Sequence, residues 1–281
     1  LLEKYGERVP VRESEWDARH FWRVSNAEHL AMSEDCGIVN LSHFAVYDVE
    51  GPDHVALMEW LCAARIGGDA NIGKGIYTHF LDDEGMVRAD LTVMRMEDRC
   101  RVIDGADAGP RDLAYMRRVA EDEGFDVTIA DMTEKVVTIG IWGPNARATL
   151  QKAVEEPDAL LPANLAFATF RPVRIAGRDV SAFRISYVGE QGFELHMAYE
   201  DGLAVWDGLR ATGVMAFGVE TYANSRRMEK SLRLQNADLT TEYNLFEADL
   251  ARPKVKDADF RGKARHLEYR ARPHQPAMLC T

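Results

Sequence analysis

Apolar side chains recur at helical spacing in several stretches of the chain. Residues 53–65 follow the breaker and cap Gly51-Pro52-Asp53 and place four apolar side chains on one helical face: Val55, Met58, Leu61 and Cys62. Residues 111–123 repeat the pattern with Leu113, Met116 and Ala120. The same reasoning predicts helices over 146–154, capped by Asn145, over 202–211 and over 221–232.

Other stretches have the alternation and β-branched content of strands. Residues 75–80 and 91–94 flank the turn Asp82-Asp83-Glu84-Gly85, and 173–175 and 180–185 flank a second turn at 176–179, so each pair predicts a hairpin. Residues 136–142 form a further apolar strand that ends at Gly143-Pro144. Hairpins mixed with helices favour an α+β fold over a doubly wound parallel sheet.

Composition narrows the partners. The 281 residues include 46% hydrophobic residues, enough for a sizeable core. There are 34 Lys and Arg residues against 46 Asp and Glu, a net charge of −12, which disfavours nucleic acid as a partner. The sequence contains no apolar run of membrane-spanning length, and its first ten residues are too charged for a secretory signal. We therefore expect a cytoplasmic protein with no membrane partner.

The usual chemical motifs are missing from the sequence. The four cysteines have irregular spacings with no CxxC pair, so we expect reduced core thiols, and the eight histidines never pair at metal-ligand spacing. No metal site is predicted. The chain has no GxGxxG, no GxxxxGK[ST] and no GxSxG, which gives no support to a Rossmann cofactor, a nucleotide triphosphate or a serine nucleophile.

Positive charge is concentrated at the end of the chain. Residues 251–281 contain eight Lys and Arg residues, among them Lys254 and Lys256, against three acidic ones. Such a segment is usually a solvated face. The functional alternative is that these cations attract the anionic tail of a ligand.

Glu194 lies in an unusual segment, YVGEQGFELH (residues 187–196), where two glycines are flanked by carboxylates and aromatic residues. In a strand that resumes after the turn, Phe193 and Leu195 share one face and Glu194 takes the other. A solvent-facing Glu194 would need no explanation. An inward-facing one needs a partner, because a buried bare carboxylate is costly, and a ligand edge with two N–H donors would supply it.

Asp90 is the second acidic candidate. It follows the turn at 82–85 in the segment GMVRADLTV (residues 85–93) and opens an apolar strand. One interpretation is a turn or strand-start cap. The other is a functional carboxylate, and the residue pattern alone leaves both open.

Six colinear segments of the chain resemble the folate-dependent aminomethyltransferase family, which includes the glycine-cleavage T-protein. The resemblance is closest to the C-terminal folate domain of dimethylglycine and sarcosine dehydrogenases and to stand-alone tetrahydrofolate-dependent demethylases. The segments are VNLSHFAVYDVEGPDH (39–54), YTHFLDDEGMVRADLTVMR (77–95), IWGPNARATL (141–150), YVGEQGFELH (187–196), SRRMEKSLRL (225–234) and FEADLARPKVKDADFRGKA (246–264).

The resemblance implies a fold and a cofactor. Family members bind tetrahydrofolate in the central hole of ring-arranged α+β subdomains. It implies that residues 1–264 form this folate-binding region of interleaved subdomains, and that 265–281 begin a C-terminal barrel that is truncated, or form a tail. The short length and the first residue, which is not Met, suggest a processed or truncated chain.

The resemblance also implies roles for individual residues. Glu194 matches the glutamate that pairs with the pterin ring's N–H groups, and a carboxylate offers two acceptors for parallel donors. Asp90 matches the catalytic aspartate beside the reactive folate nitrogens. Tyr77 and Tyr187 match pocket-wall tyrosines. Arg227 matches a family arginine in the folate site, and its neighbour Arg226 could serve instead.

Two departures from the family pattern separate the chain from a plain glycine-cleavage T-protein. Gly105 occupies the place of a family asparagine, and Asn40-Leu41-Ser42 replaces the usual Asp-Leu-Ser. We therefore expect a tetrahydrofolate-dependent methyl or methylene transferase that demethylates a small N-methylated amine, such as a methylated glycine or betaine, or else a sulfonium or ether.

Two alternatives belong to other functional classes. The chain could be the detached folate module of a flavin amine oxidase system, capturing formaldehyde equivalents made by a flavoprotein partner. It could also be a non-catalytic folate-binding protein, although the cysteine motif KGCxxGQE of such relatives is missing from this sequence. The sequence does not determine the oligomeric state.

Overall fold

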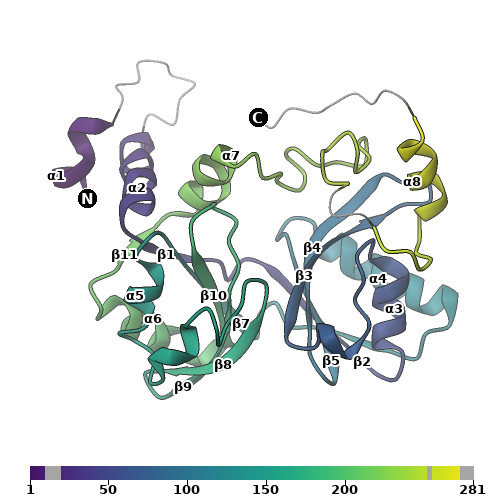
Figure 1. Ribbon diagram of the computed structural model, residues 1–281, viewed down its shortest axis with the longest axis horizontal. Helices are drawn as coiled ribbons and strands as arrows, with labels where there is room; N and C mark the ends of the chain where they lie inside the picture. The colour runs from purple at the N-terminus through teal and green to yellow at the C-terminus, as the bar shows by residue number, and fades with distance from the viewer. Residues whose placement is uncertain (10–19, 252–254, 273–281) are drawn as a thin grey trace. The chain divides into compact units, whose positions relative to one another are not determined.

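The computed structural model describes residues 1–9, 20–251 and 255–272 (Figure 1). The chain folds into two compact units, and each unit is assembled from two separate stretches of sequence. Unit 1 contains Leu1–Ser42 and Lys135–Leu232, and unit 2 contains His43–Glu134 and Arg233–Thr281. The units are described separately.

Unit 1 is built on a six-stranded sheet with the order β11-β1-β7-β10-β9-β8. Only the β1–β11 pair is parallel. The strands are β1 (Gly37–Asn40), β7 (Val136–Trp142), β8 (Phe170–Ile175), β9 (Arg178–Phe183), β10 (Gly192–Ala198) and β11 (Met215–Phe217). The helices are α1 (Leu2–Tyr5), α2 (Trp22–Glu34), α5 (Ala146–Leu150), α6 (Gly202–Arg210) and α7 (Arg227–Glu229). A π-helical turn, Thr221–Arg226, precedes α7.

One face of this sheet forms the core of unit 1. Alternate side chains of β7 and β10, such as Ile141, Phe193 and Leu195, pack with Leu150 of α5 and Leu209 of α6 in a single buried cluster. Because neighbouring strand residues point to opposite faces, the residues between them face away from this cluster. Glu194 is one of these.

Unit 2 is built on a five-stranded sheet with the order β3-β4-β5-β2-β6, in which neighbouring strands are antiparallel. The strands are β2 (Ala45–Glu50), β3 (Lys74–Leu81), β4 (Val87–Arg95), β5 (Arg99–Asp104) and β6 (Thr128–Asp131). The helices are α3 (His54–Leu61), α4 (Gly109–Glu123) and α8 (Lys263–Arg270).

Helices α3 and α4 bury one face of the unit 2 sheet (Figure 1). Leu57 of α3 and Met116 of α4 share a buried cluster with Ala89, Leu91 and Val93 of β4. The intervening β4 residues therefore lie on the other face, which we call the open face of unit 2. Asp90 belongs to that face.

The α+β class predicted from the sequence is confirmed, and most differences lie at element ends. The predicted helix over 53–65 ends at Leu61, because Cys62 turns extended and bridges to Phe80. The helix predicted over 146–154 ends at Leu150, and its cap residue Asn145 donates its side chain to Asp35 instead of capping. The helix predicted over 221–232 is a π-helical turn followed by the three-residue α7.

The structure also bears on the expectations for the cysteines, for the boundary after residue 264 and for membrane-spanning segments. Cys36, Cys62 and Cys100 are free and buried, as expected of core thiols, and Cys280 lies outside the described residues. Helix α8 crosses the boundary expected after residue 264, and its Tyr269 packs against Gly85 of unit 2. Within the described ranges, no helix combines the length and apolarity needed to cross a bilayer.

Candidate functional site

Asp90 lies in the middle of β4, not at its start. The prediction that it opens the strand, and with it the capping interpretation, is wrong, because β4 begins at Val87 and continues to Arg95. Only 10% of its side chain is exposed. The buried atom Oδ1 has no partner with hydrogen-bond geometry among the described residues. The open face of unit 2 thus carries a carboxylate oxygen with unused acceptor capacity.

His79 is the nearest charged neighbour of Asp90. The register of the β3–β4 hairpin places the two residues opposite each other, with His79 Nε2 3.2 Å from Asp90 Oδ1. The separation fits an ion pair when the imidazole is protonated, although the angles do not make a hydrogen bond. His79 is not among the site residues predicted from the sequence. The predicted hairpin could have indicated it, because strand pairing places a residue of the first strand opposite Asp90.

Tyr77 lies on the same face of β3, two residues before His79. Its hydroxyl is 3.1 Å from His79 Nε2, and the two rings meet edge to face with centroids 4.9 Å apart. Half of Tyr77 is exposed. An unprotonated Nε2 accepts from the tyrosine hydroxyl, whereas a protonated Nε2 donates to the tyrosine oxygen and adds a positive charge close to Asp90. The structure therefore brings the predicted pair Tyr77 and Asp90 together through His79.

The helix-covered face of the same sheet holds a second buried carboxyl, Asp104, which the sequence analysis did not select. It is the neighbour of Gly105, the residue that replaces a family asparagine, and its Oδ1 accepts from the Gly105 amide at 2.7 Å. Burial raises the pKa of Asp104 to about 8, with the Asp112 carboxylate as the second cause. At neutral pH Asp104 is therefore mostly protonated.

Glu194 lies on β10 in unit 1, on the face opposite the core, and is 6% exposed. Of the two alternatives above, the inward-facing one is correct. Its Oε2 is 3.3 Å from His196 Nε2, and His196 Nδ1 lies 3.1 Å from the Thr138 hydroxyl. His196 Nε2 has no hydrogen-bond partner among the described residues, so the Glu194–His196 contact is an ion-pair distance only.

A glycine and an indole shape the space beside Glu194. Gly140 of β7 pairs with Glu194 across the ladder. A Cβ added at Gly140 would lie 2.0 Å from the Trp142 ring, so the indole lies flat against this glycine. The Trp142 ring contacts Tyr222 at 5.1 Å between centroids, and Tyr222 contacts Tyr187 at 5.2 Å. Glu194 thus lies beside rigid aromatic surface, the setting that suits a flat heterocycle.

The two candidate arginines have different partners. Arg227 is 1% exposed, and its guanidinium donates to the backbone oxygens of Ala223 and Leu232 at 2.8 and 3.1 Å. Arg226 donates instead to two carboxylates, those of Glu190 and Glu229, at 2.8 Å each. Glu190 belongs to the same YVGEQG segment as Tyr187. The structure therefore brings Arg226 to the candidate motif.

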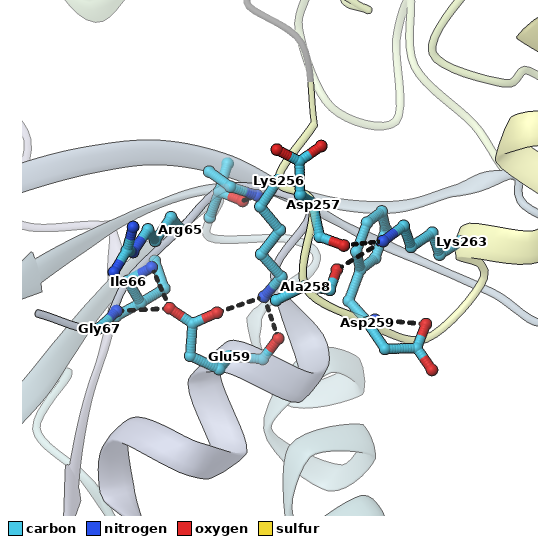
Figure 2. Close-up of polar contacts among 12 residues, drawn as sticks. Glu59, Arg65, Ile66, Gly67, Lys256, Asp257, Ala258, Asp259 and Lys263 are labelled. Carbon is cyan, nitrogen blue, oxygen red and sulfur yellow. Dashed lines mark hydrogen bonds and ion pairs between the residues drawn. The ribbon is translucent and has the colours of Figure 1, made fainter.

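The basic segment at the end of the chain is largely paired within unit 2. Lys256 is buried and donates to the Glu59 carboxylate at 2.7 Å (Figure 2). Arg261 pairs with Asp83, and Arg265 pairs with Glu84. Lys256 is therefore not part of a solvated face, and the Glu59 carboxylate already balances its charge, which disfavours the alternative that it attracts a ligand tail. Arg252 and Lys254 lie outside the described residues.

The Lys256–Glu59 pair lines a cavity of about 930 Å³ between α3, the loop 65–68 and the segment 255–259 (Figure 2). The Glu59 carboxylate also accepts from the amide of Ile66 at 2.7 Å, so both members of the pair are satisfied. Lys256 is the candidate from the sequence that lines this cavity, whereas Asp90, Glu194 and the candidate tyrosines do not line it. In the described part of the chain, no group of three His, Cys, Asp or Glu side chains could hold a metal ion.

Comparisons with known proteins agree with this architecture. A family profile described as the GCVT N-terminal domain matches residues 3–255. Rat dimethylglycine dehydrogenase is 30% identical over 281 residues, covering 97% of this chain and 31% of that protein. An aminomethyltransferase of Thermus thermophilus is 31% identical over 238 residues, covering 84% and 66%.

A solved structure gives the same result. The glycine cleavage system aminomethyltransferase T from Bartonella henselae matches with a TM-score of 0.74 and 26% identity, over 87% of this chain and 65% of that one. The chain thus spans about a third of the dehydrogenase and just under two thirds of the aminomethyltransferases.

Proposed function

Because the chain belongs to the GCVT N-terminal domain family, we propose that it is a tetrahydrofolate-dependent one-carbon transferase whose folate-binding region covers residues 1–264. Its donor is a small N-methylated amine such as a methylated glycine or betaine. The names of the relatives, aminomethyltransferase and dimethylglycine dehydrogenase, support this class of donor. Sulfonium compounds and methyl ethers are the competing donors.

The observation that carries this proposal is the buried Oδ1 of Asp90 on the open face of unit 2, which lies at ion-pair distance from His79 but has no hydrogen-bond donor among the described residues. A buried carboxylate oxygen without a donor is costly, so a ligand N–H that fills it is strongly favoured. Tyr77 and His79 lie beside Asp90 and can move a proton to or from it. Asp90 orients the amine and holds its proton during transfer.

Glu194 supports folate as the second ligand. Its carboxylate is buried on the same sheet face as the Trp142 ring. The His196 imidazole lies 3.3 Å from it, without hydrogen-bond geometry. These residues fit a flat ring that offers two parallel N–H donors. Tyr187 packs against Tyr222 with the rings tilted, next to the Trp142 ring that Tyr222 also contacts. When bound, tetrahydrofolate supplies the nitrogen that accepts the one-carbon group.

Arg227 has a separate place in this proposal. Its guanidinium donates to backbone oxygens of its own segment, which supports a role in holding the turn after α7. In the proposed site it contributes positive charge close to the folate and keeps the backbone of 223–232 in place. Catalysis by such an arrangement rests on positioning and local electrostatics.

The test is a panel of methylated amines, sulfonium compounds and aryl methyl ethers, each incubated with tetrahydrofolate. Mass spectrometry should detect methyl- or methylenetetrahydrofolate with at least one N-methylated amine. Asp90→Asn, with folding verified by circular dichroism, is the control and should lose this product. Formation of the product at the wild-type rate by Asp90→Asn would contradict the proposal.

A second candidate function is supported by the dehydrogenase relative, of which this chain matches about a third. In that case the chain is the folate module of a flavin amine oxidase system and captures formaldehyde equivalents. The discriminating reaction supplies formaldehyde and tetrahydrofolate with no methylated donor. Acceleration of methylenetetrahydrofolate formation in this reaction alone would favour the second function, whereas turnover of an amine without any oxidant favours the first.

A further inference from the structure

Arg226 lies in a π-helical turn that interrupts the α-helical geometry before α7. The turn Thr221–Arg226 carries two side chains that reach the YVGEQG segment: Tyr222 packs on Tyr187, and Arg226 pairs with Glu190. Single π turns inside helices are rare and often occur at functional sites. One wide turn thus connects to both ends of the loop formed by residues 187–190.

The guanidinium of Arg226 connects three segments of unit 1. Its side chain is only 3% exposed. Nη2 donates to Glu190 Oε1 at 2.8 Å, and Nη1 donates to Glu229 Oε2 at 2.8 Å and lies 3.2 Å from His29 Nε2 of α2. The pKa of His29 is lowered by its burial and by Arg226, so the imidazole is neutral at physiological pH and can accept from Nη1. A buried cation of this kind requires its carboxylate partners.

Glu190 lies at the C-terminal end of the 187–190 loop, two residues before β10 begins. On its N-terminal side, Gly189 adopts a φ of +80°, and a Cβ there would lie 2.2 Å from the Lys230 side chain. On its C-terminal side, a Cβ on Gly192 would lie 2.0 Å from the Ile141 backbone oxygen. The backbone on both sides of Glu190 is therefore packed too closely for a side chain. The Glu190 carboxylate anchors a short, tightly packed loop whose neighbours are Tyr187 and Glu194.

We propose that Arg226 is a positioning residue for the ligand-binding motif: through Glu190 it fixes the loop that presents Tyr187 and Glu194 to the folate ring. This proposal rests on the proposed function for the identity of the ligand. In this proposal Arg226 does not bind the ligand itself, because both terminal nitrogens donate to carboxylates and its Nε, which has no hydrogen-bond partner among the described residues, is buried. Its two carboxylate partners have different roles. Glu190 transmits the constraint to the motif, and Glu229 only helps to hold the guanidinium.

This difference defines a matched pair of variants, Glu190→Gln and Glu229→Gln. Each removes the negative charge of one carboxylate that pairs with the Arg226 guanidinium, and each keeps the shape of the substituted side chain. Glu190→Gln should raise the dissociation constant for tetrahydrofolate about tenfold, the equivalent of one charge-assisted hydrogen bond, with kcat at saturating folate kept within about twofold. Glu229→Gln should change that dissociation constant by less than about twofold, the effect of an exposed pair.

Arg226→Lys tests the geometry of the bridge. A lysine keeps the charge but cannot present two parallel donors to two carboxylates. We expect this variant to raise the dissociation constant about as much as Glu190→Gln, and the double variant Arg226→Lys/Glu190→Gln to add little beyond either change. Simple additivity of the two effects would overturn the coupling.

The measurements are isothermal titration calorimetry with tetrahydrofolate under anaerobic conditions, steady-state turnover, and thermal unfolding of each variant. Equal effects of Glu190→Gln and Glu229→Gln on folate affinity would overturn the proposal, as would a loss of melting temperature in Glu190→Gln with unchanged affinity. Because the test reads binding, it remains decisive if the wild-type chain binds folate but turns over no amine. That outcome would contradict the proposed function alone.

Discussion

The two units each place a carboxylate on the sheet face opposite the helices, but the surroundings of the two carboxylates differ. Each has a sheet with one face buried under helices and an acidic side chain on the other face: Glu194 in unit 1 and Asp90 in unit 2. Glu194 lies on an inner strand, beside a glycine covered by a fixed indole. Asp90 lies next to the edge strand β3, beside an imidazole and a half-exposed tyrosine.

The difference indicates a division of roles. Glu194 also has a neighbouring imidazole, that of His196, but its surroundings are otherwise aromatic and suit recognition of a flat ring, so they suit binding. A carboxylate with an unfilled oxygen and a neighbouring imidazole suits proton transfer, so the surroundings of Asp90 suit chemistry. Four variants test this comparison, in order of decreasing expected effect.

Asp90→Asn should give the largest loss. The amide keeps the size of the side chain but cannot hold a proton as a carboxylate does, so turnover should fall by roughly 10² to 10⁴. Tetrahydrofolate affinity should stay within about threefold, because recognition lies with Glu194. Single-turnover kinetics and calorimetry measure the two quantities. A large loss of affinity with unchanged kcat would reverse the assignment of roles.

Glu194→Gln should affect binding more than chemistry. One acceptor becomes an amide donor facing a ligand donor, which should weaken tetrahydrofolate binding by roughly 1 to 3 kcal/mol. Calorimetry measures the affinity, and kcat at saturating folate serves as the internal control. Unchanged affinity in a folded variant would remove Glu194 from the binding site.

Gly140→Ala tests the aromatic surface beside Glu194. The new methyl would lie 2.0 Å from the Trp142 ring, so the indole must move, at a cost of about 1 to 3 kcal/mol of stability. Folate affinity should fall with the displaced ring. Gly105→Ala is the matched control, because its nearest neighbour is Asp107 Oδ1 at an ordinary 3.5 Å. Thermal unfolding and calorimetry on both variants check the prediction. Equal melting temperatures for the two would contradict it.

Asp104→Asn should have the smallest effect, visible as pH dependence. Because the folded pKa of Asp104, about 8, lies above that of an unfolded aspartate, its contribution to stability is fully present below about pH 4 and is lost as the pH rises to about 8. An asparagine does not titrate. Melting temperature should therefore fall less steeply between pH 5 and pH 8 in the variant than in the wild type, by about 2 to 4 °C for each kcal/mol of difference. Parallel melting curves across this range would refute it.

Local pattern was sufficient for much of the fold. Period-two alternation placed Phe193 and Leu195 in the core and Glu194 opposite them, and the strand over Val136–Trp142 has the predicted bounds. The ends of helices were less predictable. The helix predicted beyond Leu61 stops because Cys62 bridges to Phe80, a residue eighteen positions away whose pairing is not encoded in the local sequence.

The candidate site was predicted only in part. The motif resemblance selected Tyr77, Asp90, Tyr187 and Glu194, and the structure places each on or beside the expected strands. It did not select His79, Gly140 or Trp142, because their roles depend on which residue of a neighbouring strand lies opposite. It also favoured Arg227 over Arg226. Only the π-helical turn brings the Arg226 guanidinium to Glu190.

The sequence by itself determined the class of fold, the family, and the separation of Glu194 from the face that carries Phe193 and Leu195, since these follow from short-range periodicity and colinear motifs. The place of Asp90 within a strand and the burial of both carboxylates came from the tertiary structure. Tertiary structure alone decided which charges remain available. In the folded chain Lys256 pairs with Glu59, and Arg226 pairs with Glu190. Asp90 Oδ1 has no hydrogen-bond donor among the described residues. Pairing of charges depends on distances between residues far apart in the chain and on their burial, and neither is a property of local sequence.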